Sequence, residues 1–152
     1  MAPSWLTVAA LAATVGLSAC ERPAIAANTK LCANFKGGAA AVSADGSAPV
    51  EDCLRRWAYS LASSRDTADA VADATVAACQ GALSRWNQQA ATQAGQEGSD
   101  EALSIITGQQ TNPLVEHYSF AQSHALLYVV EARAGNCAPP DVVDGRPAGT
   151  TA

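Results

Sequence analysis

The stretch from Val50 to Cys79 is the part of this sequence that most constrains its fold. It contains two runs with helical periodicity, a short break at Ser63-Ser64-Arg65-Asp66 and one cysteine in each run, Cys53 and Cys79. In an antiparallel helical hairpin, residues at equal distances from the turn face each other. The two cysteines are centred on position 66, inside the break. The spacing therefore predicts a helical hairpin that is closed by a Cys53–Cys79 disulfide.

Composition limits both the core and the partners of the chain. The 152 residues are 49% hydrophobic and only 5% aromatic, and alanine is by far the commonest hydrophobic residue. Because alanine buries little area, we expect a thin core of one domain that needs support from disulfides. The formal net charge is -5, and no basic cluster is longer than Arg55-Arg56. Nucleic-acid binding requires a basic face, so nucleic acid is excluded as a partner.

The N-terminal segment is apolar from Trp5 to Ala19. This run is short for a membrane span and has the length of a signal-peptide core. It ends in Leu17-Ser18-Ala19-Cys20, which resembles the lipobox of bacterial lipoprotein precursors, although the first four residues carry no Lys or Arg. The resemblance implies that Cys20 is lipidated and becomes the first mature residue. The protein would then be anchored by lipid in the bacterial cell envelope, facing the periplasm.

Two other readings of the N-terminus remain open. Ala24-Ile25-Ala26 matches the small-residue site of an ordinary secretory signal, which would release a soluble protein to the periplasm. Alternatively, the segment is retained or its start is misassigned. Both export readings leave four cysteines in the mature domain, at positions 32, 53, 79 and 137.

An even number of cysteines in an exported chain predicts two disulfides, for which three connectivities exist. If Cys53 pairs with Cys79, Cys32 pairs with Cys137 and closes a loop of roughly a hundred residues. The chain-entropy model gives such a loop up to about 4–5 kcal/mol of stabilisation. A zinc site is disfavoured because no C-x-x-C pair is present, and we expect no cofactor.

The chain divides into four segments. We expect a signal peptide (1–19), a flexible tether and loop (20–48), a helical domain (49–137) and a disordered tail (138–152). Caps, breaks and apolar periodicity predict four helices. The first is capped by Ser47 and has Pro49 in its first turn, and the others run over about 67–93, 99–107 and 113–134. In the first helix, the expected apolar stripe is Val50, Leu54, Trp57 and Leu61. Trp86 is the main apolar anchor of the second helix. In the last helix, the expected apolar stripe is Leu114, Tyr118, Ala121, Ala125, Tyr128, Val129 and Ala132.

His117, His124 and Glu131 form a polar row beside the apolar stripe of the last helix. Imidazoles and carboxylates bind metals or transfer protons. However, seven helical residues separate the two histidine Cα atoms by ~10.5 Å, which is unfavourable for one metal site. We therefore expect a structural role for this row, with metal binding and acid–base chemistry as weaker alternatives.

Two groups of charged residues are candidates for contact with a ligand, a partner or an ion. The best candidates for contact with a ligand or partner are Arg55, Arg56 and Tyr59, because arginine forms paired hydrogen bonds with carboxylates and stacks on aromatic rings. The simpler interpretation is that these residues lie on a solvated helix face. Asp66, Asp69 and Asp73 suggest calcium, but carboxylates at a helix start are usually solvated and favoured by the helix dipole.

The sequence predicts an all-α protein, a small bundle of about four helices with two disulfides. It contains none of the G-x-S-x-G, S-x-x-K, H-E-x-x-H or glycine-rich phosphate motifs. Our leading hypothesis is a non-enzymatic envelope protein, anchored to the membrane, that binds another envelope protein. The alternative is a periplasmic protein that binds a small ligand or metal through the histidine row. A hydrolase is the third hypothesis, because catalytic triads leave little local trace.

Overall fold

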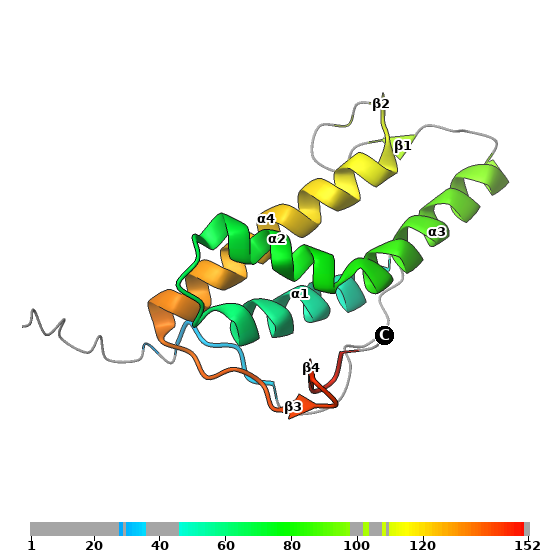
Figure 1. Ribbon diagram of the computed structural model, residues 1–152. Coiled ribbons are helices and arrows are strands. Elements are labelled where there is room, and N and C mark those ends of the chain that lie inside the picture. The colour runs from blue at the N-terminus through cyan, green and yellow to red at the C-terminus, as the bar shows by residue number, and fades with distance from the viewer. Residues whose placement is uncertain are drawn as a thin grey trace, which may run out of the picture.

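The computed structural model describes residues 28, 30–35, 46–97, 102–103, 108 and 110–150. The predicted all-α bundle of about four helices is confirmed (Figure 1). In chain order the elements are α1 (Ser47–Leu61), α2 (Ala68–Ala78), α3 (Gln80–Glu97), β1 (Ala102–Leu103), β2 (Gln110–Thr111), α4 (Pro113–Gly135), β3 (Val142–Val143) and β4 (Arg146–Pro147). No helix in the described part of the chain is long and apolar enough to cross a membrane.

The helical hairpin predicted around Cys53 and Cys79 is present. Helices α1 and α2 are joined by the turn at 62–67, and the Thr67 hydroxyl caps α2 by accepting a hydrogen bond from the Ala70 amide at 3.3 Å. The two cysteines form a disulfide with their Cα atoms 5.9 Å apart. The position of the break was therefore sufficient to predict this bridge.

The helix predicted over about 67–93 is instead two helices. At Cys79 the backbone has φ -99° and ψ 11°, outside the helical range, and its amide is shared between the carbonyls of Thr75 and Val76. Figure 1 shows α3 leaving this point in a new direction toward the start of α4. The only local sign in the sequence is Gly81, a weak helix former two residues later.

Helix α4 packs against α1, α2 and α3. It begins as predicted: the Asn112 side chain accepts a hydrogen bond from the Leu114 amide at 2.9 Å, and Pro113 occupies the first turn. It ends at Gly135, followed by Asn136 in the left-handed conformation. The buried apolar core is Val50, Cys53, Leu54, Ala58, Tyr59, Val71, Ala72, Val76, Cys79, Ala82, Leu83, Trp86, Ala121, Ala125, Tyr128, Val129 and Ala132.

Two segments differ from the sequence-based expectation. The helix predicted over 99–107 is not found at Ala102–Leu103, which pairs as a short antiparallel strand with Gln110–Thr111. The tail predicted to be disordered from 138 contains a second hairpin, β3–β4. Its turn residues Asp144 and Gly145 both have positive φ, as the common two-residue hairpin turn requires. The Asp-Gly pair was the missed signal.

Candidate functional site

A polar cluster spans the interface between α1 and α4. The Tyr128 hydroxyl donates a hydrogen bond to Glu51 Oε1 at 2.5 Å and accepts one from Arg55 Nη2 at 3.0 Å. Arg55 Nη2 also lies 3.1 Å from Glu51 Oε1, and His124 Nδ1 lies 3.3 Å from the Tyr128 hydroxyl. The cluster joins the middle of α4 to the first half of α1.

The electrostatics of this cluster follow from its partial burial. Burial, reinforced by the hydrogen bond to Glu51, raises the pKa of Tyr128 from 10.0 to about 12. Burial opposes the charged form of Arg55, but its bond to Tyr128 and the charges of Glu51 and Glu131 raise its pKa overall. Arg55 Nε is buried and has no hydrogen-bond partner within the described residues. The guanidinium carbon lies 4.5 Å from the centroid of the Tyr128 ring, so a cation–π contact partly replaces that bond.

Arg56 is not the surface residue that the sequence suggested, because only 4% of it is exposed. Its Nε donates to Asp52 Oδ2 at 2.7 Å, and its Nη1 donates to the carbonyl of Ala148 at 2.6 Å. Gly149 lies so close that a Cβ there would be 2.7 Å from the guanidinium carbon. Arg56 therefore ties α1 to the C-terminal hairpin.

Tyr59 is likewise buried, with 2% exposed. Its hydroxyl accepts a hydrogen bond from the Ala33 amide at 3.0 Å and donates one to the Leu31 carbonyl at 3.3 Å. Its ring meets Phe35 edge to face, with 5.0 Å between centroids. The expectation that Arg56 and Tyr59 lie on a solvated face is wrong, because the N-terminal loop and the C-terminal hairpin cover that side of α1. Of the three candidates, Arg55 alone is substantially exposed.

The histidine row does not converge on one point. His117 stacks on Trp86 with 3.5 Å between ring centroids, and its Nδ1 lies 2.6 Å from Asn87 Oδ1. Burial lowers the pKa of His117 below 6.5. His124 stacks on Phe120 at 3.9 Å. Each imidazole thus packs against an aromatic ring.

No metal-ligating group is formed in the described part of the chain. Among these residues, no three His, Cys, Asp or Glu side chains are placed to hold an ion. His117, His124 and Glu131 do not form one, nor do Asp66, Asp69 and Asp73. Arg133 secures the turn beside Asp66 by donating to the carbonyls of Ala62 and Asp66, each at 3.0 Å.

Both predicted disulfides are present. Cys32 pairs with Cys137, with 5.4 Å between their Cα atoms, and Cys53 pairs with Cys79. All four cysteines are therefore accounted for without zinc. Cys20, the predicted lipidation site, lies outside the described residues, as does the predicted signal peptide (1–19).

Sequence reasoning missed a group of exposed apolar side chains at the start of α4, namely Leu114, Val115 and Tyr118, which we call the distal cluster. Leu114 and Tyr118 were expected in the buried stripe, but each is about half exposed: 52% and 50%. Tyr118 also accepts a hydrogen bond from Gln122 Nε2, which donates to Asp73. The first turns of α4 are therefore incompletely covered.

One open crevice lies beside the Cys32–Cys137 bridge. It has a volume of about 400 Å³ and is lined by Ala33, Asn34, Phe35, Ala138, Pro139, Pro140 and Asp141. Its lining residues include an amide and one carboxylate but no histidine or serine, and the neighbouring cysteines, Cys32 and Cys137, are joined in the disulfide. This set of side chains does not assemble a nucleophile with a base.

Comparison with known proteins returns no relative: no protein-family model matches the chain, and neither the curated proteins nor the solved structures give a match.

Proposed function

We propose that this protein is an exported, lipid-anchored envelope protein that acts as a non-enzymatic binding module for another protein. The observation that carries the proposal is the distal cluster. Leu114, Val115 and Tyr118 expose apolar surface together at one end of α4. Contiguous exposed apolar side chains are a common mark of protein-binding sites.

The position of the cluster on α4 supports this reading. Leu114 and Tyr118 lie on the same helical face as Ala121 and Ala125, which are buried against the other helices. That face continues past the part of α4 that the described helices cover, so its first turns keep apolar surface exposed. A partner that brings an apolar helix or loop would complete the packing.

The compartment is inferred from two independent features. The two disulfides require an oxidising environment to persist, and the lipobox-like segment before Cys20 matches an envelope anchor. Arg55 is paired with Glu51 and Tyr128, so it is not included in the proposed binding face. Release as a soluble periplasmic protein remains the alternative location.

Photo-crosslinking in the cells that naturally produce the protein tests the proposal. A benzophenone amino acid replaces Val115 in one variant and Val142 in the other; both valines are exposed, at opposite ends of the described domain. We expect a defined protein adduct from position 115 only. That adduct should be lost when Leu114→Asp is added and kept when Val143→Asp is added. An adduct of equal yield from both positions, or none from position 115, would refute binding through the distal cluster.

A further inference from the structure

A second group of exposed apolar side chains lies at the other end of α4. Leu31 is 44% exposed, and Leu127 and Val130 are each 49% exposed. Residues 127 and 130 are about 60° apart on the helix at 3.6 residues per turn, so they share one outward face. We call these three residues the corner cluster. The partner binding proposed above involves the distal cluster and does not involve these three residues.

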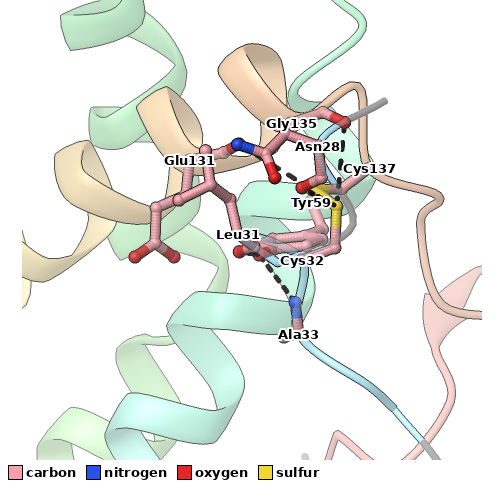
Figure 2. Close-up of a disulfide and its surroundings, with 8 residues drawn as sticks. All are labelled: Asn28, Leu31, Cys32, Ala33, Tyr59, Glu131, Gly135 and Cys137. Atoms are coloured by element: carbon pink, nitrogen blue, oxygen red, sulfur yellow. Dashed lines mark hydrogen bonds between the residues drawn. A yellow bond between two sulfur atoms is a disulfide. The ribbon is translucent and has the colours of Figure 1, made fainter. Parts of the chain in front are cut away.

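The N-terminal part of the chain reaches the domain at this corner. Leu31 directly precedes Cys32, whose bridge to Cys137 follows the last turn of α4. Figure 2 shows Leu31, Glu131, Gly135 and the disulfide gathered there. A Cβ on Gly135 would lie 2.5 Å from Cys137 Sγ and 3.5 Å from the carbonyl oxygen of Asn28. Asn28, the first described residue, therefore lies at the carboxyl end of α4.

The length of that segment limits where a membrane anchor can be. Cys20 precedes Asn28 by eight residues, and a fully extended chain spans at most ~3.6 Å per residue, or roughly 29 Å in total. A bilayer that holds an acyl chain on Cys20 therefore lies within roughly 29 Å of Asn28, which is beside Gly135. Counted along α4 from Gly135, Leu127 is eight residues away and Tyr118 is seventeen, or roughly 12 and 26 Å at 1.5 Å per residue, so the corner cluster is the nearer of the two to the anchor.

We infer that the corner cluster is a membrane-contacting surface, and that Leu31, Leu127 and Val130 insert between lipid headgroups when the anchor holds the protein at the bilayer. This inference rests on the lipid anchor of the proposed function. Three side chains are too few to hold a protein on a membrane, so their role is to orient an anchored domain. The distal cluster then faces away from the bilayer, where a protein partner can reach it.

Photolabelling from the lipid phase tests this orientation. The lipidated protein is reconstituted in phosphatidylcholine vesicles containing a phospholipid with a diazirine in its acyl chain, irradiated, and mapped by peptide mass spectrometry. We expect labels on Leu31, Leu127 and Val130. Val142 and Val143 are more exposed, at 66% and 58%, and serve as the internal control that stays unlabelled.

A pair of variants separates lipid contact from simple exposure. Leu127→Asp with Val130→Asp should lower the label on Leu31 at least several-fold while flotation with vesicles persists through the anchor. The matched pair Leu114→Asp with Val115→Asp should leave that label unchanged. Two results with acylated, vesicle-bound protein would overturn this inference and leave the lipid anchor intact. One is labelling of Val142 and Val143 as strong as that of the corner cluster, and the other is no labelling of the corner cluster. A protein without acyl mass would overturn the anchor as well as the inference.

Discussion

Tyr128 of α4 donates its hydroxyl hydrogen to Glu51 of α1 across a distance of 2.5 Å, and Arg55 lies over the same phenol ring. This contact fixes the first half of α1 against the middle of α4. Because these side chains bond across the helix interface, the cluster favours one arrangement of α1 relative to α4. We therefore assign the cluster a structural role in aligning α1 with α4.

Removing the hydroxyl with Tyr128→Phe is expected to destabilise the fold by about 1.5–3 kcal/mol, because a hydrogen bond to a charged group is lost. The pKa of Tyr128 also makes stability depend on pH. Its value rises from 10.0 to about 12 on folding, so the unfolded chain loses its proton first. The contribution of Tyr128 to folding stability is complete below pH 10 and is lost as the pH rises toward 12.

Two measurements check this prediction. Urea unfolding gives the stability difference, and the late part of the phenol absorbance change in an alkaline titration should decrease by about one tyrosine in Tyr128→Phe. Tyr118→Phe, at an exposed position, is the control and should leave the late part of the change in place. A late absorbance change of the same size in Tyr128→Phe would contradict the assignment.

Arg56 is predicted to hold the C-terminal hairpin in place. Arg56→Ala removes the donor to the Ala148 carbonyl and leaves Asp52 without its 2.7 Å ion pair. Because Asp52 keeps some access to water, we expect the free energy of unfolding to fall by about 2–4 kcal/mol, at or below the lower part of the range for a broken buried ion pair. Hydrogen exchange should accelerate at the Ala148 and Thr150 amides, which bond to Asp141 and Pro147.

Arg65→Ala is the matched control for Arg56, since it removes the same charge from an exposed loop position. It should change stability by less than about 0.5 kcal/mol. Unchanged exchange of the hairpin amides in Arg56→Ala would show that Arg56 does not hold the hairpin.

Gly135 is predicted to be required by the neighbouring bridge. A Cβ at this position would lie 2.5 Å from Cys137 Sγ and 3.0 Å from Cys32 Sγ. Gly135→Ala should therefore cost about 1–3 kcal/mol through overpacking and reduce the yield of the Cys32–Cys137 bridge. Gly95→Ala in α3 meets nothing within 4 Å and should stabilise the fold by about 0.5–1 kcal/mol. Equal effects of the two variants in urea unfolding would argue against this packing.

His117 is predicted to make stability sensitive to acid. Burial keeps its folded pKa below the unfolded value of 6.5, so the unfolded chain binds a proton first as the pH falls. Stability from this group is present above pH 6.5 and decreases as the pH falls below that value. His117→Phe keeps a ring against Trp86 and should abolish this part of the pH dependence. Urea unfolding of both proteins near pH 7.5 and near pH 5.5 gives the comparison; an equal loss in the two proteins would contradict it.

Much of the fold could be predicted from the sequence because its signals are local. The break at 63–66 gives the end of α1 and the start of α2, and the cap at Asn112 and the stop at Gly135 give the bounds of α4. The Cys53–Cys79 spacing identifies one bridge and thereby the other. These features depend on residues that are close in sequence or on a symmetric hairpin. No knowledge of the remaining packing was needed to read them.

The surfaces could not be predicted, because burial depends on distant segments. Arg56 and Tyr59 lie beside the expected stripe of α1, yet both are buried by residues 31–35 and 148. Conversely, Leu114 and Tyr118 have the periodicity of a core stripe, yet each is about half exposed, because the described helices do not cover the first turns of α4 completely. Helical periodicity shows which residues share a face, but it does not show what covers that face.

The most direct test of the account is the intact mass of the protein purified from its own envelope, before and after reduction. We predict a chain that begins at Cys20, carries added acyl mass and gains about four protons on reduction of its two disulfides. A lipid-free chain that begins at Ala27, or one that takes up no protons on reduction, would contradict the anchored and cross-linked protein described above.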